Sequence, residues 1–332
     1  MYIEILDHLN KTKLNIWTDF LKKSSLEPDP LVDRTALLWD SETLVAAGSR
    51  YGNILKCIAV DESYQGEGLT ASVITALKND AFSEGIRHLF LYTKPKNKMI
   101  FEDLFFYTIA QTDDVLLMEN QKNGIENFLA TFPDNNITGK TGCMVMNCNP
   151  FTKGHLYLAE TAAKECEKLY IFVVSEDKST FSAQDRLEMV KRGTAHIKGV
   201  TVLPSGPYLI SAATFPTYFL KDKENTEEIK CLLDIEIFSR YYSKKFKIST
   251  RFVGTEPLSP STAKYNAALK SNLSKYGIEL KEIPRLKCSG SPISASMVRS
   301  LIDNGNVQKV KELLPYTTYE YLLDKGILNQ EG

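Results

Sequence analysis

A short stretch in the middle of the chain combines side chains and a backbone position suited to binding phosphate. Thr152 and His155 flank a lysine and Gly154, where an apolar run, TGCMVM, meets a stretch typical of a helix. Because the first N–H groups of a helix lack partners within it, a helix start is a ready anion site. Gly154 lets the backbone approach a ligand closely. The stretch predicts phosphate binding, although a plain strand–helix turn with an incidental histidine fits the same residues.

A second candidate anion site lies near the end of the chain. In SGSPISASMVRSLID, Ser294 and Ser296 fall in the first turn of a predicted helix and Arg299 follows one turn later. Hydroxyls, unpaired N–H groups and a guanidinium at one helix start can hold an anion. An N-cap serine beside a surface arginine is the ordinary alternative. Between the two sites, RFVGTEP ends a predicted strand at Gly254, where a flat base could lie against the backbone.

These residues lie among strands and helices that alternate along the second half of the chain. Such alternation predicts a parallel sheet with helices on both faces, and ligands of these sheets bind beyond the carboxyl ends of the strands. The candidate residues follow strands or begin helices, as such a site requires. The predicted strands are 141–147, 169–174, 199–203, 250–254 and 278–283; the predicted helices are 154–167, 183–195, 260–275 and those from 294 onward.

The first half has its own strands and a glycine-rich loop. TALLWD, TLVAAGSR and NILKCIAV predict successive strands, and residues 69–85 predict an amphipathic helix that ends at Gly85 before the strand RHLFLYT. The loop QGEGLT, 65–70, precedes that helix. The polar segment 133–142, PDNNITGKTG, is the best linker candidate. We therefore predict domains at 1–132 and 143–332.

Composition narrows the class of protein. The chain has 332 residues, is 43% apolar and 24% charged, and carries 40 basic against 41 acidic residues. A net charge of −1 argues against nucleic-acid binding, and no apolar run is long enough to cross a membrane. The six cysteines are dispersed and only four histidines are present, so we identify no metal ligands among the side chains. We expect reduced thiols and a cytoplasmic location.

The C-terminal motifs together resemble the nucleotidyltransferase superfamily of the (T/H)xGH type. Thr152 to His155 match its signature, and the segment from Ile293 to Arg299 is similar to its ISSTxxR motif, with Ala295 in place of a serine. This resemblance implies that ATP lies across both helix starts and that an acceptor oxygen attacks its α-phosphate and expels pyrophosphate. It also implies catalytic roles for His155, Thr152 and Lys178. The ATP-binding set would be Asn149, Phe151, Gly154, Arg186, Gly254, Ser294, Ser296 and Arg299, with Mg2+ shared; a helix-surface salt bridge is an alternative role for Arg186.

The N-terminal loop resembles motif A of GNAT acetyltransferases, (Q/R)xxGx(G/A), whose backbone N–H groups bind the pyrophosphate of coenzyme A. Gln65, Gly66, Gly68 and Thr70 are the matching positions, and Thr70 stands where Gly or Ala is usual. The expected fold class is therefore α/β: a GNAT-like mixed domain followed by a doubly wound parallel-sheet nucleotidyltransferase domain. A plain β-turn before a helix is the alternative for the loop alone.

This pair of domains, with NPFTKGH, DRLEMVK and RFVGTEP, is similar to the citrate lyase ligase family. The resemblance implies that ATP and acetate give acetyl adenylate and pyrophosphate. The acetyl group then moves to the prosthetic-group thiol of the acyl carrier subunit of citrate lyase, a group derived from dephospho-coenzyme A. The N-terminal domain would grip that arm through the loop 65–70. The acetate pocket, the carrier-docking surface and the oligomeric state stay open.

Three alternatives share some of these features. A small-molecule adenylyltransferase with a phosphate acceptor, of the phosphopantetheine or nicotinamide-nucleotide type, shares the C-terminal motifs but does not need the N-terminal domain. A class I aminoacyl-tRNA synthetase has a related HIGH motif, but the near-neutral charge and the lack of a KMSKS lysine loop argue against it. A catalytically silent carrier-binding module would not need the intact Thr152, His155, Ser294 and Arg299.

Overall fold

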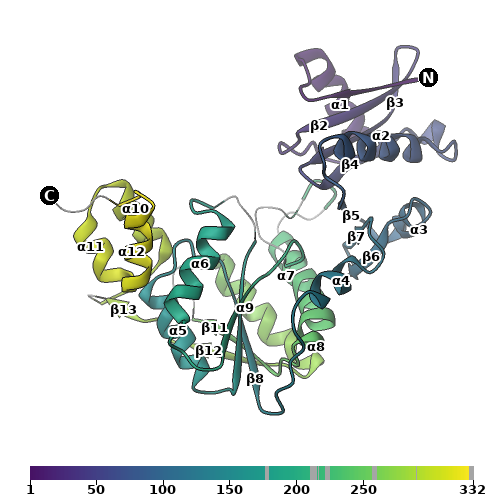
Figure 1. The fold of residues 1–332 in the computed structure, drawn as a ribbon. Coiled ribbons are helices and arrows are strands. Elements are labelled where there is room, and N and C mark those ends of the chain that lie inside the picture. Colours follow the sequence, from purple (N-terminus) through teal and green to yellow (C-terminus); the bar gives the residue numbers. More distant parts are fainter. Residues whose placement is uncertain are drawn as a thin grey trace. The chain divides into compact units, whose positions relative to one another are not determined.

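The computed structural model describes residues 1–175, 179–209, 215, 217–220, 225–255, 260–288 and 290–328. Within them the chain forms two compact units, drawn in Figure 1. Unit 1 holds Met1–Asn127 with the described residues of 214–236, and unit 2 holds the rest. The predicted boundaries, with a linker at 133–142, stay a prediction. No helix of the described residues is long and apolar enough to span a membrane.

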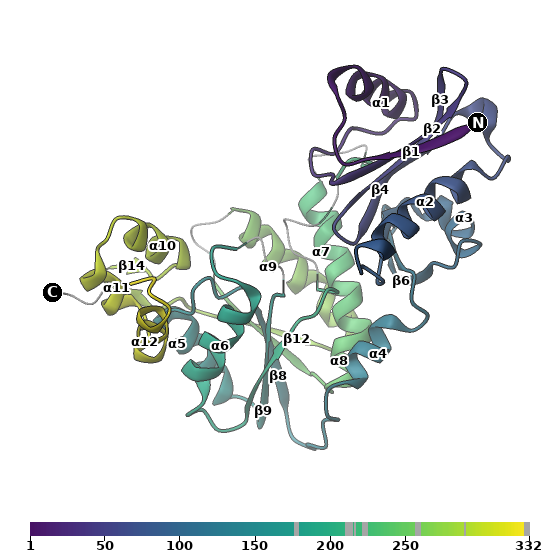
Figure 2. The same ribbon diagram turned by 45° about the horizontal axis from the view of Figure 1, so that its top comes forward.

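Unit 1 is built on a mixed, seven-stranded sheet with the order β1-β2-β3-β4-β5-β7-β6. Every neighbouring pair is antiparallel except β4 and β5, which are parallel. The helix α2 buries Val73 and Leu77 against the face of β2 that carries Ala36 and Leu38, and Figure 2 shows α1 on the other side of the sheet. The elements are β1 (Tyr2–Leu6), α1 (Lys11–Lys23), β2 (Arg34–Asp40), β3 (Thr43–Tyr51), β4 (Ile54–Val60), η1 (Glu62–Tyr64), α2 (Leu69–Ser83), β5 (Phe90–Thr93), η2 (Pro95–Asn97), α3 (Lys98–Glu102), β6 (Tyr107–Gln111), β7 (Leu116–Glu119) and α4 (Gly124–Ala130).

The parallel pair in unit 1 separates soon after it begins. Only Ile54–Phe90 and Leu55–Leu91 are paired between β4 and β5. Beyond them the phenol of Tyr218 reaches β5, where its hydroxyl donates to the backbone oxygen of Tyr92 across 3.3 Å, and the backbone of Cys57 in β4 acts on the same hydroxyl. Tyr218 is 7% exposed. A residue that lies in sequence between β10 and β11 of the parallel sheet is thus part of the core of unit 1.

Unit 2 contains a five-stranded parallel sheet with the order β10-β9-β8-β11-β12. Leu169, Ile171 and Val173 of β9 belong to one hydrophobic core, while Tyr170 and Phe172 on the opposite face contact Phe246. Helices therefore cover both faces, as Figure 1 shows for α5 and α6 against α8 and α9. The helix α7 (Thr226–Ile237) belongs to unit 1 except for its last residue. The elements of unit 2 are β8 (Thr141–Met146), α5 (Lys153–Ala163), β9 (Lys168–Val173), α6 (Ala183–Thr194), β10 (Val200–Pro204), the π-helix η3 (Phe238–Tyr242), α8 (Ser243–Lys245), β11 (Thr250–Gly254), α9 (Pro260–Asn272), the 3-10 helix η4 (Leu273–Tyr276), β12 (Glu279–Ile283), β13 (Lys287–Cys288), β14 (Ser291–Pro292), α10 (Ala295–Asp303), α11 (Val307–Leu313) and α12 (Tyr316–Asp324).

The strand order reverses between β8 and β11, and these two strands also diverge. Only Thr250–Gly142 and Arg251–Cys143 are paired, whereas β8 and β9 are paired over six residues. Such a topological switch point is where open parallel sheets bind ligands. The turn after β8 and Gly254 at the end of β11 both lie at its carboxyl edge.

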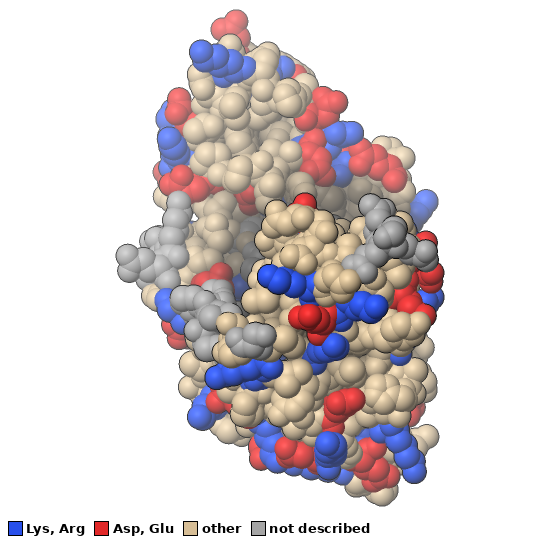
Figure 3. Space-filling view, turned by 90° about the vertical axis from the view of Figure 1, so that its left-hand side faces the viewer, with Lys and Arg blue, Asp and Glu red and all other residues tan. Residues whose placement is uncertain are grey.

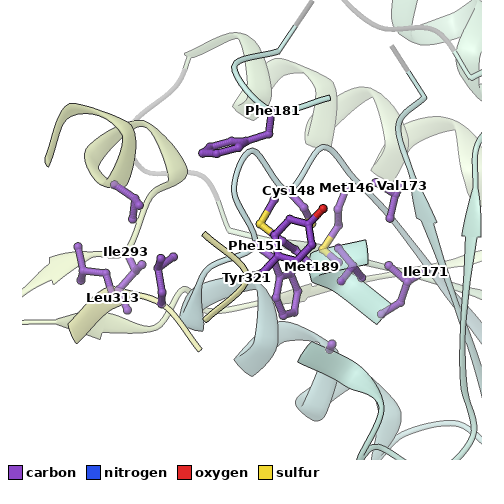
Figure 4. Close-up of a cluster of buried hydrophobic side chains, with 14 of the residues drawn as sticks. Met146, Cys148, Phe151, Ile171, Val173, Phe181, Met189, Ile293, Leu313 and Tyr321 are labelled. Carbon is purple, nitrogen blue, oxygen red and sulfur yellow. The ribbon is translucent and has the colours of Figure 1, made fainter. Parts of the chain in front are cut away.

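The predicted fold class is confirmed by this architecture of a mixed sheet followed by a parallel one. Each predicted strand of the second half is present, and 250–254 matches β11 at both ends. The helix predicted over 154–167 is shorter, since α5 ends at Ala163. The unit 2 core joins the sheet to α6 and the C-terminal helices, and Figure 4 shows Phe151, Cys148 and Met189 gathered within it.

Candidate adenylation site

The signature turn is fixed by two reciprocal hydrogen bonds at the start of α5. The Thr152 hydroxyl accepts from the backbone N–H of His155, 3.4 Å away, and the backbone N–H of Thr152 donates to Nδ1 of His155 across 3.0 Å. Thr152 is 1% exposed. This capping box satisfies two of the four N–H groups that a helix start leaves unpaired. Thr152 and His155 therefore hold each other in one arrangement.

The same geometry assigns the protonation state of His155. Because Nδ1 accepts a hydrogen bond, the neutral imidazole carries its proton on Nε2. Burial lowers the pKa of His155 to about 4, and the positive charge of Arg285 adds to this effect. At neutral pH the side chain is therefore an uncharged donor through Nε2–H. It suits stabilisation of charge on a phosphate oxygen, not proton abstraction.

Phe151 supports the histidine from below. Its ring is fully buried and lies nearly parallel to the imidazole, with centroids 5.9 Å apart and an interplanar angle of 15°. On its other side it meets Gly193 of α6, where an added Cβ would lie 2.4 Å from the ring. Figure 4 shows Phe151 beside Met189, one turn before Gly193. Phe151 is thus a packing residue between the signature turn and α6.

Two contacts bring the start of α10 to the signature turn. A Cβ on Gly154 would lie 3.4 Å from the backbone oxygen of Ile293, so the glycine permits this close approach. Nη1 of Arg299 donates to the backbone oxygen of Asn149 across 2.6 Å. At the first turn of α10, the Ser294 hydroxyl accepts from the N–H of Met297 at 3.2 Å. The two predicted anion sites therefore lie side by side.

Serine hydroxyls add to the donors at the start of α10. Ser296 is exposed, and its Oγ lies 3.1 Å from that of Ser294. The bond from Arg299 to Asn149 uses one of the five N–H groups of the guanidinium. Lys153, in contrast, turns to the end of α11, where Nζ donates to the backbone oxygen of Glu312 across 2.7 Å. The charge of Lys153 is therefore engaged away from the signature turn.

Arg186 lies beneath the site and is fully buried, so the surface salt bridge considered from the sequence is wrong. Its Nε donates to Phe181 O at 3.0 Å, and Nη1 donates to backbone oxygens of Asn147 and Val174 at 3.0 and 2.6 Å. These bonds connect the segments that directly follow β8 and β9 with Phe181, two residues before α6. The geometry supports a positioning role, because the guanidinium is enclosed by the turns that it holds. Its contact with ATP stays a prediction.

Gly254 ends β11 opposite the start of α5. A Cβ there would lie 3.8 Å from Cγ of Arg285 and 3.9 Å from Leu158, which is ordinary contact distance. Arg285 is held by its Nε, which donates to Thr255 O across 2.8 Å. Its charge also acts on His155. Sequence reasoning missed Arg285, although a basic residue two positions after the predicted strand 278–283 was an available signal.

The predictions about Lys178 and about metal binding depend on which residues the structure describes. Lys178 lies outside the described residues. Among the residues that are described, no group of three His, Cys, Asp or Glu side chains gathers in a way that could hold a metal. The donors of the site are hydroxyl, imidazole, guanidinium and backbone N–H groups, which suit phosphate oxygens and not a cation.

In unit 1, the predicted loop precedes α2 in an open conformation. Gly66 and Gly68 have φ of +91° and +77°, and no atom lies within 4 Å of a Cβ built on either. Gly68 is the N-cap and supplies no side-chain cap. Gln65 is exposed and Thr70 is partly buried in the first turn. The loop leaves room for a phosphate at the helix start, although the exposed Glu67 between the glycines places a negative charge there.

Comparison with known proteins shows which family the chain resembles over most of its length. The model of the citrate lyase ligase C-terminal domain matches residues 141–322. Citrate (pro-3S)-lyase ligase of Klebsiella pneumoniae is 40% identical over 310 residues, which cover 92% of this chain and 91% of that protein. Phosphopantetheine adenylyltransferase of Clostridium botulinum is 35% identical over 101 residues, only 30% of this chain and 57% of that protein.

A solved structure shows a weaker likeness. An acyl-CoA N-acyltransferase from Pseudomonas aeruginosa is 11% identical with a TM-score of 0.32, covering 36% of this chain and 100% of that chain. The GNAT-like fold assigned here rests on the order and direction of the strands in unit 1.

Proposed function

Since this chain belongs to the citrate lyase ligase family, we propose that it uses ATP and acetate to acetylate the prosthetic-group thiol of the acyl carrier subunit of citrate lyase. The enzyme is a ligase, and the proposed reaction class is an AMP-forming acid–thiol ligation. The six free cysteines fit a reducing, cytoplasmic setting. The proposal is supported by the proximity of the starts of α5 and α10, the two candidate anion sites, beside the switch point of the parallel sheet.

The first step is the formation of acetyl adenylate. A carboxylate oxygen of acetate attacks the α-phosphorus of ATP, the bond to the bridging oxygen breaks, and its electron pair leaves with pyrophosphate. Acetate is already an anion at neutral pH, so no base is needed and positioning is the main task. The neutral Nε2–H of His155 suits this step, because it donates to an oxygen that gains charge and takes up no proton.

In this proposal, the starts of α5 and α10 bind different phosphates of ATP. We assign the α-phosphate to His155 and the start of α5, with Lys178 as an additional cation near it. Ser294, Ser296 and Arg299 would hold the β- and γ-phosphates, with Mg2+ carried on those phosphates. Gly254 leaves space for the adenosine at the end of β11, where a Cβ would already be in contact with Arg285 and Leu158. Asn149, Phe151 and Gly154 shape the turn and touch ATP through their backbone at most.

The second step transfers the acetyl group to sulfur. The carrier thiolate attacks the carbonyl carbon of acetyl adenylate, the bond to the phosphate oxygen breaks, and AMP leaves with the electron pair. None of the six cysteines is required, and burial raises the pKa of Cys57 and Cys143 to about 12. We propose that the loop from Gln65 to Thr70 binds the diphosphate of the dephospho-coenzyme A-derived arm, since Gly66 and Gly68 leave the start of α2 open.

The proposal rests on the proximity of the two helix starts: the Arg299–Asn149 hydrogen bond and the close approach of Gly154 to Ile293 bring the start of α10 to the turn before α5. The test is transfer of radiolabelled acetate to purified, deacetylated citrate lyase in the presence of ATP. We expect label on the carrier subunit, released by hydroxylamine, together with one AMP per acetyl group. Formation of ADP, or adenylyl transfer to a phosphorylated acceptor without acetate, would contradict the proposal.

A further inference from the structure

Asn147 is an exposed residue in a turn that is otherwise buried. It directly follows β8, and its neighbours Met146, Cys148 and Asn149 are 8%, 1% and 7% exposed. The turn continues into the capping box at the start of α5. An exposed amide at the carboxyl end of the central strand is therefore available to a ligand of the switch point. None of the roles assigned above uses it.

The buried Arg186 holds this exposed amide in one orientation. Nη1 of Arg186 donates to Oδ1 of Asn147 across 2.6 Å and to its backbone oxygen across 3.0 Å. Because a guanidinium has only donors, Oδ1 must face it and Nδ2 must face away. Arg186 is itself fixed by bonds to Val174 and Phe181 and is fully buried. The amide therefore presents N–H donors, not an acceptor, at the rim of the sheet.

A nearby hydroxyl uses one of these donors. Nδ2 of Asn147 donates to Oγ of Ser179 across 3.2 Å, and an amide nitrogen carries two hydrogens. A preoriented N–H donor is suited to an oxygen anion, since little conformational freedom is lost when the anion binds. A neutral amide also leaves a bound carboxylate more nucleophilic than a cationic partner would, because it does not neutralise the charge.

We propose that Nδ2 of Asn147 donates to the carboxylate of the acid substrate and thereby sets it beside the α-phosphate. This inference rests on the proposed acid-activating function and names the residue that recognises the acid. Asn147 lies two residues from Asn149, whose backbone oxygen binds Arg299, and five residues from Thr152. One carboxylate oxygen is held by the amide, and the other attacks phosphorus.

The decisive variant is Asn147→Asp. The new carboxylate still accepts from Arg186, so the fold is retained, but an acceptor with negative charge replaces the Nδ2 donor. In acetate-dependent ATP–pyrophosphate exchange we expect the KM for acetate to rise by about tenfold to a hundredfold. The KM for ATP should change by about twofold or less. Asn147→Ala should raise the acetate KM as well, with a lower melting temperature because Arg186 loses a partner.

The matched control is Ser179→Ala, which removes the hydroxyl that lies 3.2 Å from Nδ2 and 3.4 Å from Oδ1 and leaves the amide held by Arg186. We expect it to alter the acetate KM by about twofold or less. An unchanged acetate KM in Asn147→Asp, or an equal rise in the KM for ATP, would overturn the role of Asn147 while acetate activation by the wild type still stands. If the wild type exchanges with another acid, the variant must raise the KM for that acid. Absence of exchange with any acid overturns both proposals.

Discussion

The backbone N–H of Thr152 donates to Nδ1 of His155, and this single hydrogen bond decides which ring nitrogen carries the proton. The Thr152 hydroxyl in turn accepts a hydrogen bond from the backbone N–H of His155. The pair is thus both the cap of α5 and the support of the proposed catalytic donor. An uncharged imidazole fits a reaction in which the attacking acid brings no proton to remove.

The first prediction concerns pH. The pKa of His155 is lowered by burial and by Arg285 to about 4 in the folded protein, against about 6.5 in an unfolded chain. The unfolded state therefore binds more protons between these values, so this part of the stability is fully present above pH 6.5 and is lost as pH falls towards 4. We expect a histidine NMR signal that titrates below pH 5 and has its proton on Nε2. A His155 signal that titrates near 6.5 would contradict this account.

The second prediction separates two roles of Thr152. Thr152→Ala removes the cap of α5 and should lower the free energy of unfolding by about 1–2 kcal/mol. It should also lower exchange activity, because the imidazole loses a neighbour at Nδ1. Thr152→Ser keeps the hydroxyl and should therefore retain most of the free energy of unfolding and most of the exchange activity. Loss of stability with unchanged exchange would show that Thr152 only caps the helix.

The third prediction concerns Gly193 and Phe151. Replacing a glycine within a helix by alanine normally gains about 1 kcal/mol, but here the new Cβ would lie 2.4 Å from the Phe151 ring. The ring is fully buried, so overpacking should dominate, and Gly193→Ala should destabilise unit 2 by about 1–3 kcal/mol. Adding Phe151→Leu should recover part of the loss. Denaturant unfolding of the single and double variants measures this, and a stabilised Gly193→Ala would refute the contact.

The fourth prediction concerns Arg299. Arg299→Lys keeps the charge but cannot both bind the Asn149 oxygen and present a planar fork to phosphate. We expect the KM for ATP to rise by about tenfold, with little change in the KM for acetate. Steady-state ATP–pyrophosphate exchange, measured at varied ATP and at varied acetate, gives the two KM values separately. Equal KM values for ATP in wild type and variant would remove Arg299 from the phosphate site.

The fifth prediction tests the loop of unit 1. Gly68→Glu places a charged side chain at the start of α2 and should slow acetyl transfer to the carrier without changing ATP–pyrophosphate exchange. Gly85→Glu is the matched control, since both glycines have a φ near +80° and open space around a Cβ, so the backbone strain is alike. Equal transfer rates in the two variants would show that the loop does not bind the arm.

Local patterns in the sequence predicted the parallel sheet and the two helix starts, because strand ends, caps and glycines depend on neighbouring residues. Contacts between distant segments were not predictable in this way. Tyr218 is packed between β4 and β5 of unit 1, over a hundred positions earlier in sequence. Arg186 is on a polar-looking helix yet is fully buried, because carbonyl oxygens from three separate segments surround it. The charge of Arg285 lowers the pKa of His155 because the fold brings together two residues that are far apart in sequence.

The most direct test of the central claim is ATP–pyrophosphate exchange with the purified protein, with and without acetate, in wild type and His155→Ala. We predict that exchange requires acetate in the wild type and falls by about a hundredfold or more in the variant. The melting temperatures of the two proteins show whether the variant is folded. Exchange that proceeds without acetate, or that persists undiminished in a folded His155→Ala protein, would contradict acid activation at the His155 site.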